Sequence, residues 1–280
     1  GVKLLQVVAS VTCVGFLYSI GRRVADVSTG RWAAWIFAIH PTVVFFTGTL
    51  WIETLYMFFL ISSAWAVLWS REGRWTRALL PGLLLGFAAL FRGIATYVAP
   101  LFILAMLWPD RGVLSPSSMI EGFRNRWKHG LGLLCMTLFV LAPYSIHASQ
   151  KHGGVVLSDA TLGHVMFLSN NDFPPLTFDY GNGMLTSPLY NRYLRQGRPP
   201  CVRRQPPARS SRCDVEKAKS WILDNPIEFI SRIPLRLAQW LNPHTFFTRH
   251  LRWGYWPGLD YFLKEALVFY TALFSAIVIL

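Results

Sequence analysis

Residues 78–108 read ALLPGLLLGFAALFRGIATYVAPLFILAMLW, and Arg92 is the only charged residue in this stretch. About one residue in four is charged in an ordinary soluble domain, so uncharged runs on either side of Arg92, at 78–91 and 94–108, indicate membrane-crossing helices. The same pattern recurs in five further uncharged runs, at residues 7–20, 32–50, 54–70, 130–147 and 266–280. The sequence therefore predicts seven transmembrane segments.

The overall composition agrees with this prediction. Hydrophobic residues make up 53% of the 280-residue chain, charged residues 15%, and the mean hydropathy is +0.36. Several runs are shorter than the roughly 20 residues that cross a bilayer. Tryptophans lengthen them, because indole rings favour the headgroup region; these are Trp51, Trp69, Trp75, Trp108 and Trp127. Seven runs without β-alternation argue against a soluble α/β core, and the predicted fold class is an all-α polytopic transmembrane bundle.

Basic residues are distributed unevenly among the short connections between these runs. Three alternate connections hold ten of them: Arg22, Arg23, Arg31, Arg71, Arg74, Arg77, Arg111, Arg124, Arg126 and Lys128. The intervening connections hold only Arg92. Because short cytoplasmic loops are rich in Lys and Arg, we expect the ten to face the cytoplasm and Arg92 the outside. The stretch 149–263 is then extracytoplasmic, since loops beyond about 60 residues escape this rule.

The predicted organisation has three parts. Residues 1–148 form the first six transmembrane helices, 149–263 form one large extracytoplasmic loop domain, and 264–280 begin a further transmembrane helix. The chain starts at Gly1 without an initiator Met and stops inside an apolar run. We therefore expect it to be incomplete at both ends.

The large loop has mixed local signals. Residues 154–157 and 164–169 resemble strands, and 180–212 is irregular because glycine and proline break any period. Asp214 is predicted to cap a helix that ends after Asp224, before Asn225-Pro226. An amphipathic helix is predicted at 227–241, with Trp and Arg content that suits a membrane interface.

The four cysteines divide between two environments. Cys13 and Cys135 lie in apolar runs, where a small buried thiol is the ordinary interpretation. Cys201 and Cys213 both lie in the predicted outer loop, where an oxidising compartment favours a disulfide between them. Neither cysteine nor histidine spacing matches a metal-binding pattern, so no divalent metal is expected.

Two stretches resemble a known family. Residues 39–56, IHPTVVFFTGTLWIETLY, resemble the junction of the third and fourth helices in polytopic glycosyltransferases of the GT-C class. The resemblance is to the protein mannosyltransferase and aminoarabinose transferase branch, of the glycosyltransferase family 39 type. Residues 82–92, GLLLGFAALFR, resemble its small-residue helix that ends in an outward-facing arginine. WILDNP at 221–226 and NPHTFFTRHLR at 242–252 resemble segments of its large outer loop.

The resemblance implies transfer of a sugar from a polyprenyl-phosphate donor at the outer face of a bacterial-type inner or plasma membrane. No other cofactor is firmly implied. The family's general base is an Asp in an outer loop that, in this register, precedes Gly1, so no catalytic residue is identified here. A non-catalytic GT-C-derived scaffold subunit of a larger membrane complex is the alternative. An upstream Asp would favour the enzyme. A transporter fits less well, because the apolar runs hold few ionisable residues.

Two residues are candidates for binding the substrate within the predicted bundle. Glu53 either caps the helix that follows it, where a carboxylate is favoured, or positions an acceptor or sugar hydroxyl. Arg92 either extends to the lipid headgroups or binds a lipid-linked phosphate, which guanidinium holds with two hydrogen bonds. Both end apolar segments on the same predicted side, so we expect them to approach each other.

The outer loop adds a second group of candidates: His244, Arg249, His250 and Arg252. Trp253 and Tyr255 beside them suit either sugar stacking or an interfacial aromatic belt. Membrane lipids and a polyprenyl-phosphate sugar are the predicted partners, and other membrane subunits remain open. No nucleic-acid partner is expected, because the loop lies outside and carries no recognisable binding motif.

Overall fold

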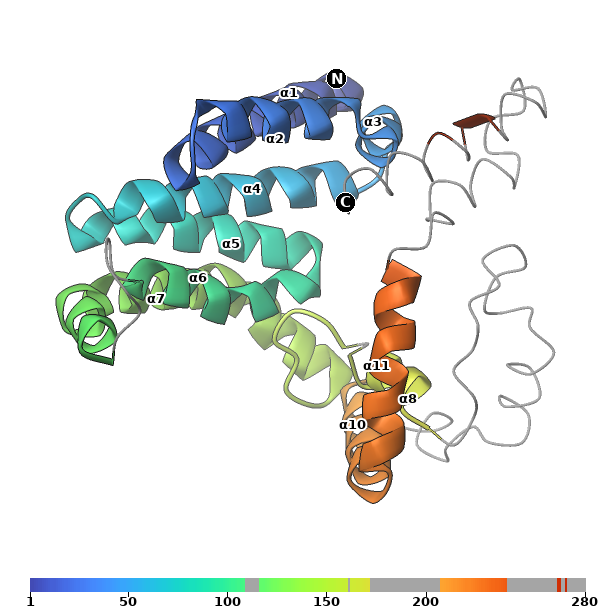
Figure 1. Cartoon of the computed structure of the whole chain (residues 1–280). Helices are drawn as coiled ribbons and strands as arrows, with labels where there is room; N and C mark the ends of the chain where they lie inside the picture. Colours follow the sequence, from blue (N-terminus) through green and yellow to red (C-terminus); the bar gives the residue numbers. More distant parts are fainter. Residues whose placement is uncertain (109–115, 161, 172–206, 241–265, 268–269, 271–280) are drawn as a thin grey trace. The chain divides into compact units, whose positions relative to one another are not determined.

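The computed structural model describes residues 1–108, 116–160, 162–171, 207–240, 266–267 and 270, and these residues form an all-helical structure (Figure 1). The chain divides into two compact units. The N-terminal unit holds Gly1–Ala148 and Val156–Asp159, and the C-terminal unit holds Ser149–Val155 and Ala160–Leu280. The predicted all-α class is thus confirmed across the part of the chain that the structure describes.

The N-terminal unit begins with a tightly packed helix pair, α1 (Val2–Val24) and α2 (Val27–Ile39). Glycines allow the close approach, since a Cβ added to Gly21 would lie 2.7 Å from Cα of Gly30. Asp26 caps α2 by accepting a 2.6 Å hydrogen bond from the backbone N–H of Thr29. This bond also lowers the pKa of the Asp26 carboxyl from its usual value.

The predicted segment 32–50 is not one helix. α2 ends at Ile39, and a separate helix α3 (Pro41–Gly48) follows. Proline has no N–H to continue the helix, and it favours an extended conformation in the residue before it, which His40 adopts with φ −63° and ψ 119°. His40 Nδ1 instead accepts a 3.2 Å hydrogen bond from Thr42 N–H.

A second sharp bend follows, of 119° between α3 and α4 (Glu53–Ser70). Among the described residues, Val2–Val24 and Ile120–His152 are long and apolar enough to cross a membrane. The bent pair Pro41–Gly48 and Glu53–Ser70 makes a third if it is one broken span. The chain is therefore an integral membrane protein by its helices, but the seven-segment count is not confirmed.

Two predicted segments correspond to shorter apolar helices. Residues 78–91 contain the end of a 3-10 turn, η1 (Trp75–Ala78), and α5 (Leu79–Phe91). Residues 94–108 contain η2 (Gly93–Val98) and α6 (Ala99–Leu107). The segment 130–147 is the middle of a long helix, α7 (Pro116–His152). Most of 266–280 lies outside the described residues.

Helix α5 packs between α4 and α7 through small residues. Ser63 on α4 donates a 2.8 Å hydrogen bond to the Pro81 carbonyl, and Thr137 on α7 donates one of 3.1 Å to the Gly82 carbonyl. A Cβ on Gly82 would lie 2.4 Å from the Leu133 carbonyl oxygen, and one on Gly86 would lie 2.6 Å from Val140. Close approach at small residues is a common mode of helix association in membranes.

Basic connections meet at one end of the N-terminal unit, as the sequence predicts (Figure 1). Arg23 after α1 pairs with Glu72 after α4 at 3.7 Å. The carbonyl of Trp108, at the end of α6, accepts from Arg71 at 2.7 Å and from Arg126 at 2.9 Å. Which side of a membrane this end faces stays a prediction.

The regular structure of the described part of the C-terminal unit is helical, where the sequence predicted mixed structure. Residues 164–169, predicted as a strand, belong to α8 (Leu162–Ser169), and 154–157 form no regular element. The predicted strand is wrong because period-2 and helical patterns cannot be told apart over so few residues. α8 packs against α10 (Pro207–Asp224), where the N–H of Gly163 donates to Ser211 Oγ at 3.0 Å.

The predicted start of α10 is also wrong. The helix begins at Pro207, which suits a first helical turn, and Asp214 lies buried inside it. Its predicted end is confirmed: α10 stops at Asp224 and Pro226 opens α11 (Pro226–Trp240).

Candidate functional site

The strongest candidate site lies at the end of the N-terminal unit away from the basic connections. Glu53 is the first residue of α4, where the positive end of the helix dipole favours a carboxylate. Arg92 follows the last residue of α5, and its backbone N–H donates to the Ala88 carbonyl at 2.9 Å. A cation is favoured at that end of a helix. Both charges therefore suit their backbone positions.

Glu53 and Arg92 form an ion pair across the two helices, from Arg92 Nη2 to Glu53 Oε1. They are 39 residues apart in the sequence, so the expectation that they approach each other is confirmed. The carboxylate side chain is 11% exposed and the guanidinium side chain 48% exposed. The pair therefore consists of a buried anion and a cation that solvent or a ligand can reach.

The buried carboxylate is only partly satisfied. Glu53 Oε2 and the neighbouring Thr54 Oγ1 are both buried without a hydrogen-bond partner among the described residues. Buried polar atoms in folded proteins almost always have a partner, so such atoms call for an explanation. At an end of a helical bundle, a ligand hydroxyl is one group that would satisfy them.

Aromatic packing fixes the two helix ends that carry this pair. The ring of Phe59 on α4 stacks on the ring of Phe91 at a centroid distance of 5.6 Å. The centroid of the Phe87 ring lies 5.3 Å from that of Phe59. Phe91 directly precedes Arg92. Apolar contacts of Phe91 therefore help to hold the end of α5 that carries Arg92.

Residues that the sequence analysis missed lie close to the same helix ends. The Gln6 amide, buried on α1, donates a 2.8 Å hydrogen bond to the Trp51 carbonyl, two residues before Glu53. Thr96 Oγ1 lies 3.0 Å from Ser158 Oγ, and a Cβ on Gly93 would lie 2.7 Å from Cβ of Asp159.

The short segment Val156–Asp159 therefore brings a second carboxylate, Asp159, next to the residue that follows Arg92. Gln6 could have been noticed as the only amide beside the first apolar run. Nothing in the local sequence marks Asp159, because its place depends on a contact with η2, more than 60 residues away.

The other predicted site residues are not brought to this pair by the described structure. His244, Arg249, His250 and Arg252 lie outside the described residues, as does Cys201. Cys213 is disulfide-bonded, and its pairing with Cys201 stays a prediction. Cys13 is free and buried as expected, whereas Cys135 is free but exposed, which corrects its predicted burial.

The chemistry that this geometry offers is recognition of an anion beside a hydroxyl. A half-exposed guanidinium binds phosphate with two parallel hydrogen bonds, a geometry that lysine cannot reproduce. A carboxylate next to it accepts hydrogen bonds from hydroxyl groups. Phosphate and hydroxyl recognition together are what a sugar phosphate requires.

Comparison with known families gives one match. A model of the dolichyl-phosphate-mannose-protein mannosyltransferase family matches residues 1–147, the part that contains α1 to most of α7 and the ion pair. No curated protein and no solved structure matches the chain.

Proposed function

Because this chain belongs to the dolichyl-phosphate-mannose-protein mannosyltransferase family, we propose that it transfers a sugar from a polyprenyl-phosphate donor to an acceptor at the outer face of the membrane. The family gives the class, a membrane glycosyltransferase. The donor, the side of the membrane and the roles of individual residues are the proposal. The observation that carries it is the half-exposed Arg92 held by a buried Glu53.

Arg92 is the proposed site of the donor phosphate. Its guanidinium is half exposed and is bound by a single carboxylate oxygen of Glu53. The phosphate of a lipid-linked sugar is a diester with one negative charge, like a carboxylate, and its two free oxygens suit the two parallel hydrogen bonds of a guanidinium, so it can compete with Glu53 for Arg92. Stabilising negative charge on the phosphate also favours its departure from the sugar.

Glu53 has two proposed roles, one before and one after the donor binds. Without donor it holds Arg92 in position, and with donor bound its oxygens accept hydrogen bonds from a hydroxyl of the sugar or the acceptor. The partnerless Glu53 Oε2 supports the second role. The phosphate would thus exchange one partner of Arg92 for another and leave the carboxylate free for a hydroxyl.

The proposed reaction is a direct displacement at the anomeric carbon. The acceptor hydroxyl oxygen bonds to this carbon while the bond to the phosphate oxygen breaks, and the electron pair leaves with the polyprenyl phosphate. A carboxylate base takes the hydroxyl proton. The family resemblance assigns that base to an Asp in an outer loop.

The proposed orientation follows from charge. The end that holds Arg23, Arg71 and Arg126 faces the cytoplasm. Glu53 and Arg92 then face the outside of a bacterial-type inner or plasma membrane. By the same distribution of basic residues, the region 149–263 is also proposed to be extracytoplasmic.

The test is binding of a fluorescent polyprenyl phosphate to the full chain in lipid nanodiscs. Arg92→Ala should weaken binding by about tenfold to a hundredfold, which corresponds to one charge-assisted hydrogen-bonding group of about 1.5–3 kcal/mol. Arg124→Ala, an exposed arginine in a predicted cytoplasmic connection, is the matched control and should leave the affinity unchanged.

A second variant separates recognition from folding. Glu53→Gln with Arg92→Gln removes both charges, so no buried carboxylate is stranded, and it should bind as weakly as Arg92→Ala. Wild-type affinity in both variants would overturn the phosphate role of Arg92 and favour the scaffold alternative. Recovery of affinity in the double variant alone would mean that Arg92 acts only through the fold.

A further inference from the structure

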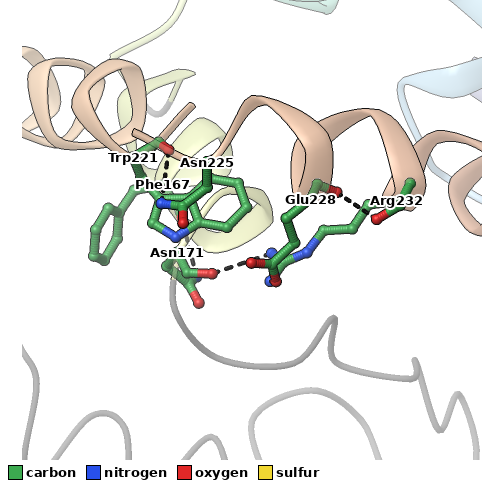
Figure 2. A network of polar contacts seen from close by, with 7 residues as sticks. Phe167, Asn171, Trp221, Asn225, Glu228 and Arg232 are labelled. Atoms are coloured by element: carbon green, nitrogen blue, oxygen red, sulfur yellow. Dashed lines mark hydrogen bonds and ion pairs between the residues drawn. The ribbon is translucent and has the colours of Figure 1, made fainter. Parts of the chain in front are cut away.

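The C-terminal unit contains a helix, α11, with a buried arginine, Arg232, and exposed isoleucines. α10 and α11 are separated by Asn225, whose side-chain amide donates to the Trp221 carbonyl at 3.0 Å (Figure 2). The N–H of Phe229 donates to the Asn225 carbonyl at 3.0 Å, which starts the new helix. This turn fixes which face of α11 meets the rest of the unit.

Arg232 is the residue by which α11 is attached. It is 5% exposed, its guanidinium carbon lies 4.4 Å from the centre of the Trp221 ring, and Nη1 donates to the Asn171 carbonyl at 3.1 Å. Its Nη2 pairs with Glu228, one turn earlier on α11 (Figure 2). The guanidinium of Arg232 is therefore buried, while its partner Glu228 stays half exposed.

Over the described side chains of α11, at 226–234, the side away from Arg232 carries exposed apolar residues. Ile227 is 83% exposed and Ile230 is 62% exposed. At 100° per residue these two share one face with Pro234, while Arg232 lies well away from it. An amphipathic helix on a water-soluble unit has the reverse arrangement, with its apolar stripe toward the core and its charges toward solvent. Water alone does not account for this orientation.

The chemistry of the surroundings indicates what covers this face. The chain is an integral membrane protein with a net charge of +13, and seven arginines precede this turn between Arg192 and Arg212. α11 itself carries Arg236 and Trp240 in its last turns. Apolar residues on one face, with Arg and Trp nearby, are the composition of helices that lie in the headgroup region of an anionic bilayer.

We propose that α11 lies in the plane of the membrane interface, with Ile227 and Ile230 inserted among the lipid acyl chains and Arg232 holding the C-terminal unit to the helix from the other side. The occupant of the apolar face is a phospholipid leaflet. This inference is independent of the proposed sugar transfer, because it uses none of the residues assigned to the donor. It makes α11 an anchor that ties the C-terminal unit to the bilayer surface.

The test measures which solvent reaches Ile230. The full chain carries Ile230→Cys with a fluorescent label, in a background in which the free Cys13 and Cys135 are changed to Ala. It is placed in vesicles of phosphatidylcholine and phosphatidylglycerol that contain a lipid spin-labelled near the headgroup. The same label on Ser220→Cys, at an exposed polar position of α10, is the matched control.

The lipid quencher should reduce the Ile230 signal severalfold more than the Ser220 signal, and aqueous iodide should do the opposite. A label on Ile227→Cys should repeat the Ile230 result, so the test does not depend on one variant. Stronger quenching of Ile230 by iodide would overturn the proposal. So would protection of Ile230 from both quenchers, because the face would then be covered by protein.

Discussion

The two units each contain a Glu–Arg ion pair, and the burial of the two partners is reversed between them. In the N-terminal unit the carboxylate of Glu53 is buried and Arg92 is 48% exposed. In the C-terminal unit the side chain of Arg232 is 5% exposed and that of Glu228 is 50% exposed. The same two residue types therefore present an available cation in one unit and an enclosed cation in the other.

The two arginines, Arg232 and Arg92, also differ in their number of binding partners. Arg232 is bound by an aromatic ring, a backbone carbonyl and a carboxylate, from Trp221, Asn171 and Glu228. A buried guanidinium needs this many, because desolvation of a charge is costly unless its donors are satisfied. Arg92 makes one ion pair, with Glu53, and about half of its side-chain surface stays exposed. An enclosed arginine organises structure, whereas an open one is suited to a ligand.

The largest predicted effect is on the enclosed cation. Arg232→Ala should destabilise the C-terminal unit by about 3–5 kcal/mol, because it removes a buried charge network and the contact with the Trp221 ring. Urea-dependent protection from limited proteolysis, followed at the α10–α11 region of the full chain, measures this loss.

The control for this prediction is Arg212→Ala. Arg212 pairs with Glu216 one turn away at 3.3 Å, with both side chains largely exposed. Pairs of this kind contribute at most about 0.5 kcal/mol, so protection should be nearly unchanged. Equal effects of the two substitutions would remove the distinction between enclosed and open arginines.

The stability effect at the open cation should be smaller and should come from its partner. Arg92→Ala leaves the buried Glu53 carboxylate without its cation, at a cost of about 1–3 kcal/mol. Adding Glu53→Gln removes the stranded charge and should restore most of that loss. Thermal unfolding in detergent compares the three forms of the chain. If the second substitution gives no recovery, Arg92 is itself structural, like Arg232.

The smallest predicted effect is a gain of affinity. Glu53→Gln removes the group that competes with phosphate for Arg92, so polyprenyl phosphate should bind about two- to fivefold more tightly, equivalent to a half-exposed ion pair of about 0.4–1 kcal/mol. Sugar transfer should fall in the same variant, because an amide accepts hydroxyl hydrogen bonds less strongly than a carboxylate. Weaker lipid binding would mean that Glu53 orients Arg92 for the phosphate instead of competing for it.

The open pair could be predicted from the sequence, and the enclosed pair could not. Glu53 and Arg92 each end an uncharged run, and the parity of the basic connections places them at the same end of a bundle. Their meeting follows from topology alone. Arg232 lies in an amphipathic helix, where an arginine normally faces water. Its burial depends on Trp221 and Asn171, which local patterns do not bring to it.

Helix boundaries also differ in whether local sequence or tertiary contacts determine them. The break at Pro41 has a local cause, and the sequence contained the signal although 32–50 was interpreted as one segment. The start of α10 at Pro207 has less local support, because the arginines and serines that follow resemble a turn. Packing of α8 against Ser211 accompanies the extended helix. Local chemistry thus predicts ends made by proline better than starts that tertiary contacts stabilise.

The glycines of α5 have a consequence for mutations far from the ion pair. Gly82 lies ten residues before Arg92, about 15 Å along the helix axis at 1.5 Å per residue. A methyl group at Gly82 would meet the α7 backbone, which has no freedom to yield, so α5 would have to tilt or slide as a rigid rod. The displacement would be greatest at the rod's end, which carries the guanidinium. Substitutions at Gly82, inside the helix bundle, should therefore also cause loss of function.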